Sequence, residues 1–187
     1  MDNTTIIIIV VFAVMLISSM SSSAAGLYYF QEQTPSQEQK PSQEQTPSLF
    51  RIKHISSNKC LHPNWGKDNP DNNTAVVFWS GCDDSNRIKY KWLANGQIQH
   101  ISSNKCLVPS GGSNNPDNGT EVVFYDNCDD NNSVIKYKML ENGQIQHISS
   151  GKCLHPSGGS ENPADGTRLV FWNSCDDNNS VIRYKLI

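Results

Sequence analysis

Apolar and polar residues alternate in short runs over most of this chain. In the first such segment the runs lie near Ile52–Ile55, Cys60–His62, Ala75–Trp79 and Ile88–Leu93, and turn-forming residues separate them. The runs are rich in β-branched and aromatic residues, and no stretch has the 3.6-residue spacing of an amphipathic helix. We therefore predict an all-β domain with short strands over residues 49–187.

The strand pattern occurs three times. The segment at residues 52–63 returns at 98–109 and at 145–156, so the periods are 46 and 47 residues. Asn95-Gly96 and Asn142-Gly143 lie at the junctions, and Asn-Gly is a strong signal for a two-residue hairpin turn. The predicted repeats are residues 50–93, 97–140 and 144–187.

The number and size of the repeats restrict the architecture. One repeat is too small to bury its own apolar face, so the three must share a core. Propellers typically have at least four blades, and open solenoids usually end in altered capping repeats. We predict a β-trefoil of three ~46-residue repeats, preceded by an N-terminal hydrophobic helix and a disordered stalk.

The first thirty residues are strongly apolar. Residues 6–17 are all apolar, and a Ser/Ala/Gly-rich stretch leads from there to Leu27–Phe30. As a signal peptide, this segment has a suitable length and a small-residue cleavage site at Ser23-Ala24-Ala25. As an uncleaved anchor, residues 6–30 are long enough to span a bilayer, with aromatic residues at its interface. We favour the anchor for residues 1–30, and both alternatives place the rest of the chain outside the cytoplasm.

Residues 31–48 form a linker that consists of three tandem copies of a Gln/Glu/Pro/Ser-rich hexapeptide. The linker has no apolar side chain to bury, so it cannot offset its ordering entropy. Regular prolines favour extended chain, with a reach of ~3.1 Å per residue. We expect a spacer on a single-pass membrane protein, a secreted protein or a virion-surface protein.

The six cysteines form three equivalent pairs, each separated by 22 positions. Because equivalent repeats must have equivalent structures, we predict the disulfides Cys60–Cys82, Cys106–Cys128 and Cys153–Cys175. Six free thiols or a zinc site are the alternatives, but zinc sites normally use close pairs such as C-x-x-C. Each disulfide would contribute roughly 3 kcal/mol and indicates an oxidising compartment. No metal or cofactor is expected.

The charge of the domain is balanced. Four of the 18 acidic residues and one of the 15 basic residues precede residue 49, so 14 of each remain. A neutral domain without a basic run has no electrostatic reason to bind nucleic acid or acidic lipid. It is compatible with an uncharged ligand.

Residues kept in all three repeats are interpreted as scaffold. We expect buried histidines with satisfied hydrogen bonds and structural lysines. These are His54, His100 and His147, and Lys59, Lys105 and Lys152.

Residues that differ among the repeats indicate where a ligand binds. The position after Cys-Leu is His62, Val108 or His155. The loop that follows has glycines that let a backbone approach a ligand closely, although a simple turn is the alternative. These glycines include Gly66 in the first repeat and Gly158 and Gly159 in the third.

An aromatic pair precedes the second cysteine of each repeat. Because successive strand residues point to opposite faces, one ring of each pair should be near the surface. We expect the phenylalanine to be buried and Trp79, Tyr125 and Trp172 to be exposed. An exposed ring can stack on the C–H face of a sugar, while hydrogen bonds to its hydroxyl groups set the orientation.

Acidic residues follow each second cysteine. Asp83, Asp129 and Asp176 could accept hydrogen bonds from sugar hydroxyl groups. The alternative is a turn-forming role, and the ligand spacing of a calcium loop is missing. Sequons begin at Asn72, Asn118, Asn131 and Asn178.

These motifs resemble a known family over residues 50–187. Cys-x-His followed by Val-Phe-Trp-x-x-Cys resembles the ricin-type β-trefoil lectins. The His-Pro-x-Gly-Gly run at residues 155–159 is similar to the mussel-type (mytilectin-like) galactose/N-acetylgalactosamine lectins. The chain departs from the mussel pattern at residues 172–176, where His-x-Asp-x-His is expected and Trp-Asn-Ser-Cys-Asp stands. The resemblance implies the most complete site in repeat three, then in repeat one, and the least complete in repeat two.

The sequence thus predicts a non-catalytic lectin for galactose/GalNAc-type glycans or glycoproteins, with membrane attachment through the N-terminal segment. The alternative is a β-trefoil that binds a protein partner and has vestigial sugar pockets. An enzyme is disfavoured, because no nucleophile–base–orienter set is repeated. The predicted carbohydrate-binding residues are His155, Gly158, Gly159, Trp172 and Asp176, then His62, Gly66, Trp79 and Asp83, and finally Tyr125 and Asp129.

Overall fold

The computed structural model describes the β domain and not the segment before it. The described residues are 48–126, 128–129, 132–173, 175–176 and 178–187. The predicted membrane segment (residues 1–30) and all of the linker except Ser48 lie outside them. Within the described part of the chain, no helix is long and apolar enough to cross a bilayer.

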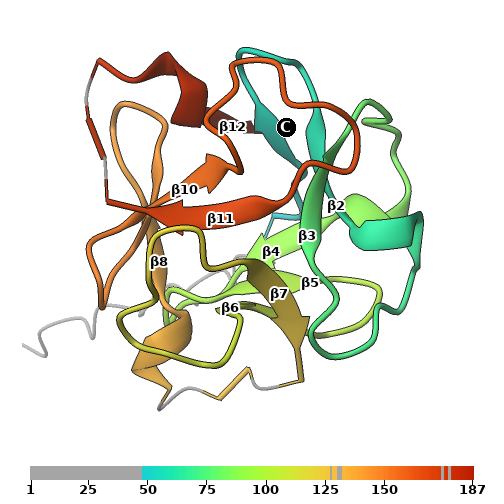
Figure 1. Cartoon of the computed structure of the whole chain (residues 1–187). Coiled ribbons are helices and arrows are strands. Elements are labelled where there is room, and N and C mark those ends of the chain that lie inside the picture. The colour runs from blue at the N-terminus through green and yellow to red at the C-terminus, as the bar shows by residue number, and fades with distance from the viewer. Residues whose placement is uncertain (1–47, 127, 130–131, 174, 177) are drawn as a thin grey trace, which may run out of the picture. The chain divides into compact units, whose positions relative to one another are not determined.

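Each repeat contributes four short strands and a 3₁₀ helix that precedes the last strand (Figure 1). The first repeat contains β1 (Ile52–His54), β2 (Cys60–Pro63), β3 (Val76–Trp79) and β4 (Tyr90–Trp92), with η1 (Asn64–Gly66) and η2 (Asn86–Ile88). The second contains β5 (Ile98–His100), β6 (Cys106–Pro109), β7 (Val122–Tyr125), η3 (Ser133–Ile135) and β8 (Tyr137–Met139). The third contains β9 (Ile145–His147), β10 (Cys153–Pro156), β11 (Leu169–Trp172), η4 (Ser180–Ile182) and β12 (Tyr184–Leu186).

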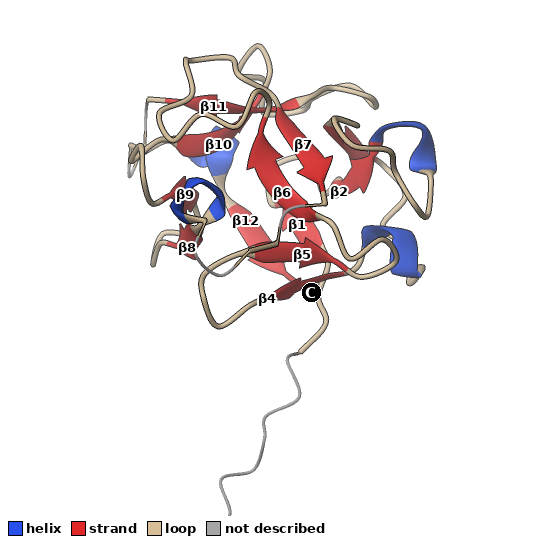
Figure 2. Ribbon diagram, turned by 90° about the horizontal axis from the view of Figure 1, so that it is seen from below, coloured by secondary structure: helices blue, strands red, loops and turns tan. Residues whose placement is uncertain are grey.

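The strands form three four-stranded sheets that do not coincide with the repeats. Each sheet combines the last strand of one repeat with the first three of the next, in the orders β12-β1-β2-β3, β4-β5-β6-β7 and β8-β9-β10-β11. In the first sheet the C-terminal strand pairs with the first strand, with Ile52 opposite Leu186. Figure 2 shows β1 and β12 side by side in this closed arrangement. The predicted all-β, threefold β-trefoil is confirmed.

All three repeats share one core, because the same positions are buried in each. Phe78, Phe124 and Phe171 pack there together with three equivalent leucines and three equivalent tyrosines, which are Leu61, Leu107 and Leu154, and Tyr90, Tyr137 and Tyr184. Each tyrosine hydroxyl donates a 3.2 Å hydrogen bond to the carbonyl of the leucine in its own repeat. Burial raises the pKa of all three phenols, so they stay neutral donors.

The invariant histidines connect neighbouring repeats: the second to the first, the third to the second, and the first to the third. In His54 the Nδ1 atom lies 2.7 Å from Ser57 Oγ, and Nε2 lies 2.6 Å from the carbonyl oxygen of Val181 in η4. A carbonyl oxygen only accepts, so Nε2 carries a proton. Burial lowers the pKa of His54, which favours the neutral ring. His100 and His147 make the equivalent contacts to the carbonyls of Arg87 and Val134. The expectation of buried, hydrogen-bonded histidines is confirmed.

The disulfides agree with their prediction. Cys60–Cys82, Cys106–Cys128 and Cys153–Cys175 are bonded, with Cα–Cα distances of 5.3, 5.4 and 5.3 Å. The hairpins form at the predicted junctions, but with three-residue loops instead of two-residue turns, because the N–H groups of Leu93 and Leu140 donate to the carbonyls of Gln97 and Gln144. The Asn-Gly pairs join β4 to β5 and β8 to β9. Gly143 has φ +85°, and a Cβ atom there would lie 3.1 Å from the carbonyl oxygen of Tyr184. Glycine is therefore required at this turn both by the backbone and by the neighbouring repeat.

The strand boundaries of the first repeat differ from the predicted ones, by one residue in the first three strands and most in the fourth. The strand expected from Ile88 begins at Tyr90, because Ile88 ends η2. The N–H of Lys89 donates to the carbonyl of Asn86, which is a turn contact and not a strand contact. Buried Ile88 made the apolar run look longer than the strand is.

Candidate functional site

The outer face of one hairpin in each repeat brings the candidate ligand-binding residues together. In the third repeat, Leu154 lies opposite Phe171 and His155 lies opposite Val170. Leu154 and Phe171 are core residues. Side chains alternate along a strand, so His155 and Trp172 share the other face of the hairpin.

The exposed and buried rings follow the predicted alternation. Trp79, Tyr125 and Trp172 are 45%, 40% and 45% exposed, whereas the phenylalanine before each of them is fully buried. A half-exposed ring at the end of a hydrogen-bonded strand is held in place on one side and open to solvent on the other. This geometry gives a flat apolar platform in each repeat.

In the third repeat the platform borders a hollow of roughly 360 Å³. We call this the third-repeat hollow, and its lining residues are His155, Pro156, Gly158, Gly159, Trp172 and Asn179. Gly158 and Gly159 have φ +79° and +66°, and no atom lies within 4 Å of a Cβ built on either. The two glycines adopt this left-handed backbone without strain and leave open space above it.

The second repeat has an equivalent hollow of roughly 390 Å³, here called the second-repeat hollow. Val108 replaces the histidine, while Tyr125 and Asn132 occupy the positions of Trp172 and Asn179. Asn73, from the loop between β2 and β3, also lines it. The repeat that looked least complete by sequence therefore retains both the ring and the hollow.

In the first repeat, His62 is buried and has a structural contact. Its Nε2 atom lies 2.5 Å from the carbonyl oxygen of Gly81, so Nε2 donates to the loop that leads to Cys82. Burial lowers the pKa of His62, and the contact with Gly81 opposes this shift. The loop glycine Gly66 has φ +62°, as in the other repeats. His62 thus holds the loop between Trp79 and Cys82 against β2.

The predicted aspartates lie in turns. Asp83 accepts hydrogen bonds from the backbone and hydroxyl of Ser85 and from Arg87. These contacts, the Ser85 hydroxyl first, lower the pKa of Asp83 to about 2. Asp176 accepts from the N–H of Asn178, 3.0 Å away. The carbonyls of Asp129 and Asp176 each accept a 2.6 Å hydrogen bond from a buried glutamine.

Two asparagines are functional candidates that the sequence analysis did not select. Asn132 and Asn179 cap η3 and η4, and each Oδ1 atom accepts from a valine N–H 3.0 Å away. Both line hollows, whereas Asp83, Asp129 and Asp176 are not among the residues that line the three hollows described. Their repetition at the same place in repeats two and three was the available signal. Repeat one is one residue shorter there, and Ser85 stands in their place.

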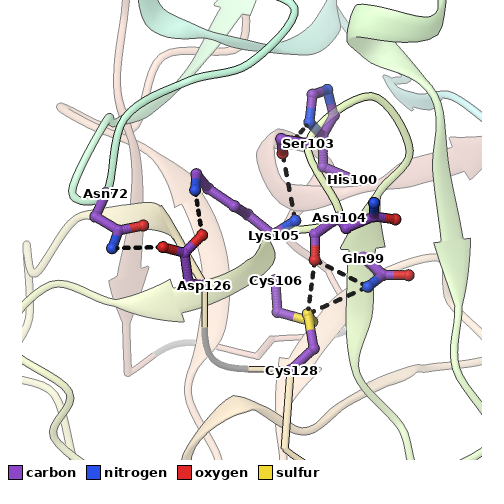
Figure 3. Close-up of polar contacts among 9 residues, drawn as sticks. All are labelled: Asn72, Gln99, His100, Ser103, Asn104, Lys105, Cys106, Asp126 and Cys128. Atoms are coloured by element: carbon purple, nitrogen blue, oxygen red, sulfur yellow. Dashed lines mark hydrogen bonds and ion pairs between the residues drawn. A yellow bond between two sulfur atoms is a disulfide. The ribbon is translucent and has the colours of Figure 1, made fainter.

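The invariant lysines bind polar side chains of the protein surface, two of them in a loop of another repeat. Lys105 forms an ion pair with Asp126, and Asp126 accepts a 3.0 Å hydrogen bond from Asn72 (Figure 3). Lys59 forms an ion pair with Asp165, which lies in the loop between β10 and β11 of the third repeat. These contacts lower the pKa of both carboxyl groups. Lys152 instead donates to Asn115 Oδ1 at 3.1 Å. All three lysines thus contact other side chains of the domain, as a structural role requires.

A β-trefoil with an exposed ring on each repeat, and with glycine-rich hollows beside two of the rings, has the architecture of a lectin. The chain belongs to the MytiLec family of alpha-D-galactose-binding lectins, whose sequence profile matches residues 50–136 and 97–183. No sequence of a curated protein matches this chain.

Solved β-trefoil structures support the fold. The designed threefold-symmetric protein ThreeFoil has a TM-score of 0.60 at 18% identity, over 74% of this chain and 97% of that one. The C-terminal half of an earthworm R-type lectin in complex with GalNAc has a TM-score of 0.57 at 15% identity, over 75% and 98%. The Rhizoctonia solani agglutinin has a TM-score of 0.57 at 19% identity, over 75% and 94%.

Proposed function

We propose that this protein is a non-catalytic lectin that binds galactose- or GalNAc-type glycans outside the cytoplasm. The observation that carries the proposal is the half-exposed Trp172 ring beside the hollow lined by His155, Gly158 and Gly159. The roughly 360 Å³ hollow lies within the ~300–1,000 Å³ range of small-molecule sites. Family membership supports galactose as the sugar class.

The site has the two kinds of contact that a neutral sugar needs. The indole of Trp172 offers an apolar face to the sugar C–H groups. Asn179 and the loop backbone at Gly158-Gly159 offer polar groups at the edge of the hollow for its hydroxyl groups. His155 is buried and lines the floor.

The repeated site supports a role in adhesion or recognition. Single shallow sugar sites bind weakly, whereas two or three sites on one domain increase avidity on a surface that displays many glycans. Three disulfides support an oxidising compartment. Display at a membrane through residues 1–30 belongs to the proposal.

A glycan array with the intact, unreduced protein tests this function. We expect binding to galactose- or GalNAc-terminated glycans that free galactose competes away. Saturable binding to a protein ligand, with no glycan bound, would favour the alternative of a protein-binding β-trefoil.

A further inference from the structure

The first repeat breaks the threefold pattern at Trp65. The equivalent positions in the other repeats are Gly111 and Gly158. Trp65 has φ +67° and ψ 8°, a left-handed conformation that is unfavourable for a bulky residue. Its ring is 85% exposed, so burial does not compensate for the strain. Strained residues of this kind cluster at functional sites.

Trp65 lines a further hollow of roughly 330 Å³, here called the Trp65 hollow. Arg168 and Glu121 form an ion pair in its wall, and Lys67 pairs with Asp71 at 2.8 Å. Each cation of the lining therefore has an anionic partner. Paired charges beside an exposed indole suit a neutral ligand with many hydroxyl groups better than an ionic one.

Asn73 belongs to both this hollow and the second-repeat hollow. Its backbone N–H donates to the carbonyl of Phe124 at 2.9 Å, which ties it to the strand that carries Tyr125. Asn73 has φ +66°, and the equivalent residues Gly119 and Gly166 are glycines. Asn73 is thus a second non-glycine residue with positive φ in the lining of the Trp65 hollow, and it is shared with the second-repeat hollow.

We propose that the two hollows form one extended site for a neutral oligosaccharide. One sugar residue stacks on Tyr125, and the next passes over Asn73 to contact Trp65. Neighbouring sugars are joined through a single glycosidic oxygen, so two hollows that share a lining residue can hold adjacent sugars of one glycan. This inference rests on the proposed lectin function, which it extends to a site built by repeats one and two.

The substitutions Trp65→Gly and Asn73→Gly test the extended site. Each substitution introduces the glycine that the other two repeats have, and glycine adopts a positive φ without strain. We therefore expect no fall in the unfolding midpoint. Both are made in a Trp79→Ala/Trp172→Ala background, which leaves Tyr125 as the intact platform. Expression without N-glycosylation avoids a glycan on the sequon at Asn72.

Calorimetry with galactose and with a panel of neutral galactose-terminated di- and trisaccharides gives the readout. In the background protein, we expect at least one oligosaccharide to bind about tenfold more tightly than galactose. Trp65→Gly should remove that gain and leave galactose affinity unchanged, and Asn73→Gly should reduce it. The extended site would be overturned if no oligosaccharide bound more tightly than galactose, or if the tighter binding survived Trp65→Gly. It would also be overturned if the background protein bound no sugar. If the unmodified protein bound no glycan at all, the lectin function itself would be rejected.

Discussion

At the scale of the residue, one four-residue strand serves both the core and the site. Phe171 is fully buried, and its neighbour Trp172 is 45% exposed beside a hollow. The two rings can therefore be separated experimentally, because one change acts on stability and the other on ligand binding.

Replacing Trp172 by alanine should weaken sugar binding in the third repeat by roughly five- to tenfold, since loss of one stacking face is worth about 1–1.4 kcal/mol. The unfolding midpoint should change little. Calorimetry with galactose in a Trp79→Ala/Tyr125→Ala background isolates this repeat. Trp172→Tyr, the ring that repeat two carries, is the matched control and should retain most of the affinity. Equal affinity in the alanine and tyrosine variants would remove the ring from the site.

Replacing Phe171 by alanine should lower the free energy of unfolding by roughly 3–5 kcal/mol, because it removes a buried ring from the shared core. Denaturant unfolding with intact disulfides measures the change. A loss below 1 kcal/mol would contradict the position of this ring in the core.

Residue types alone did not identify the whole site. Alternation predicted which rings are exposed, and repetition predicted the disulfides and the structural histidines. Asn132 and Asn179 were missed because an asparagine in a turn is explained by the turn itself. Their place at the edge of the hollows depends on where η3 and η4 fold back, and strand periodicity does not encode that. Asn73 was missed because the site it lines belongs to the next repeat.

At the scale of the element, the histidines connect each first strand to the 3₁₀ helix of the preceding repeat. Burial lowers the pKa of His54, His100 and His147 below the ordinary value of 6.5. Below about pH 6.5 the unfolded chain therefore binds more protons than the folded one, and stability falls as the pH falls. Well above pH 6.5 the three imidazoles are neutral in both the folded and the unfolded chain, so they add no pH dependence to the stability.

Chemical unfolding of the disulfide-bonded protein should accordingly show a lower free energy of unfolding at pH 5 than at pH 7.5. The aspartates with a lowered pKa, such as Asp83 and Asp165, lose their contribution only at more acidic pH. The window from pH 7 to 5 thus reports mainly on the histidines. Unchanged stability across it would mean that the imidazoles are not held neutral.

At the scale of the whole molecule, the sheets interlock the two ends of the domain. β12 completes the first sheet by pairing with β1, and Tyr184 of β12 belongs to the shared core. Sequence repetition predicted the three equivalent lobes. The exchange of strands between repeats could not be read from their periodicity, because the Asn-Gly turns mark sequence junctions and not sheet boundaries.

Deleting residues 184–187 should therefore abolish cooperative folding of the entire domain and not only of the third repeat. The deletion removes a core tyrosine and leaves β1 without its partner. Near-ultraviolet circular dichroism and thermal unfolding provide the readout, with the unmodified protein as reference. Two repeats that stay folded after the deletion would contradict a single shared core.

The central claim is that exposed rings on a rigid trefoil hold a neutral sugar. A nuclear magnetic resonance titration with galactose that follows the indole N–H signals tests it most directly. The Trp172 signal should shift in a saturable manner, while that of Trp92, which packs against the core, should stay in place. Galactose that binds without moving the Trp172 signal, or that shifts both signals equally, would contradict the account.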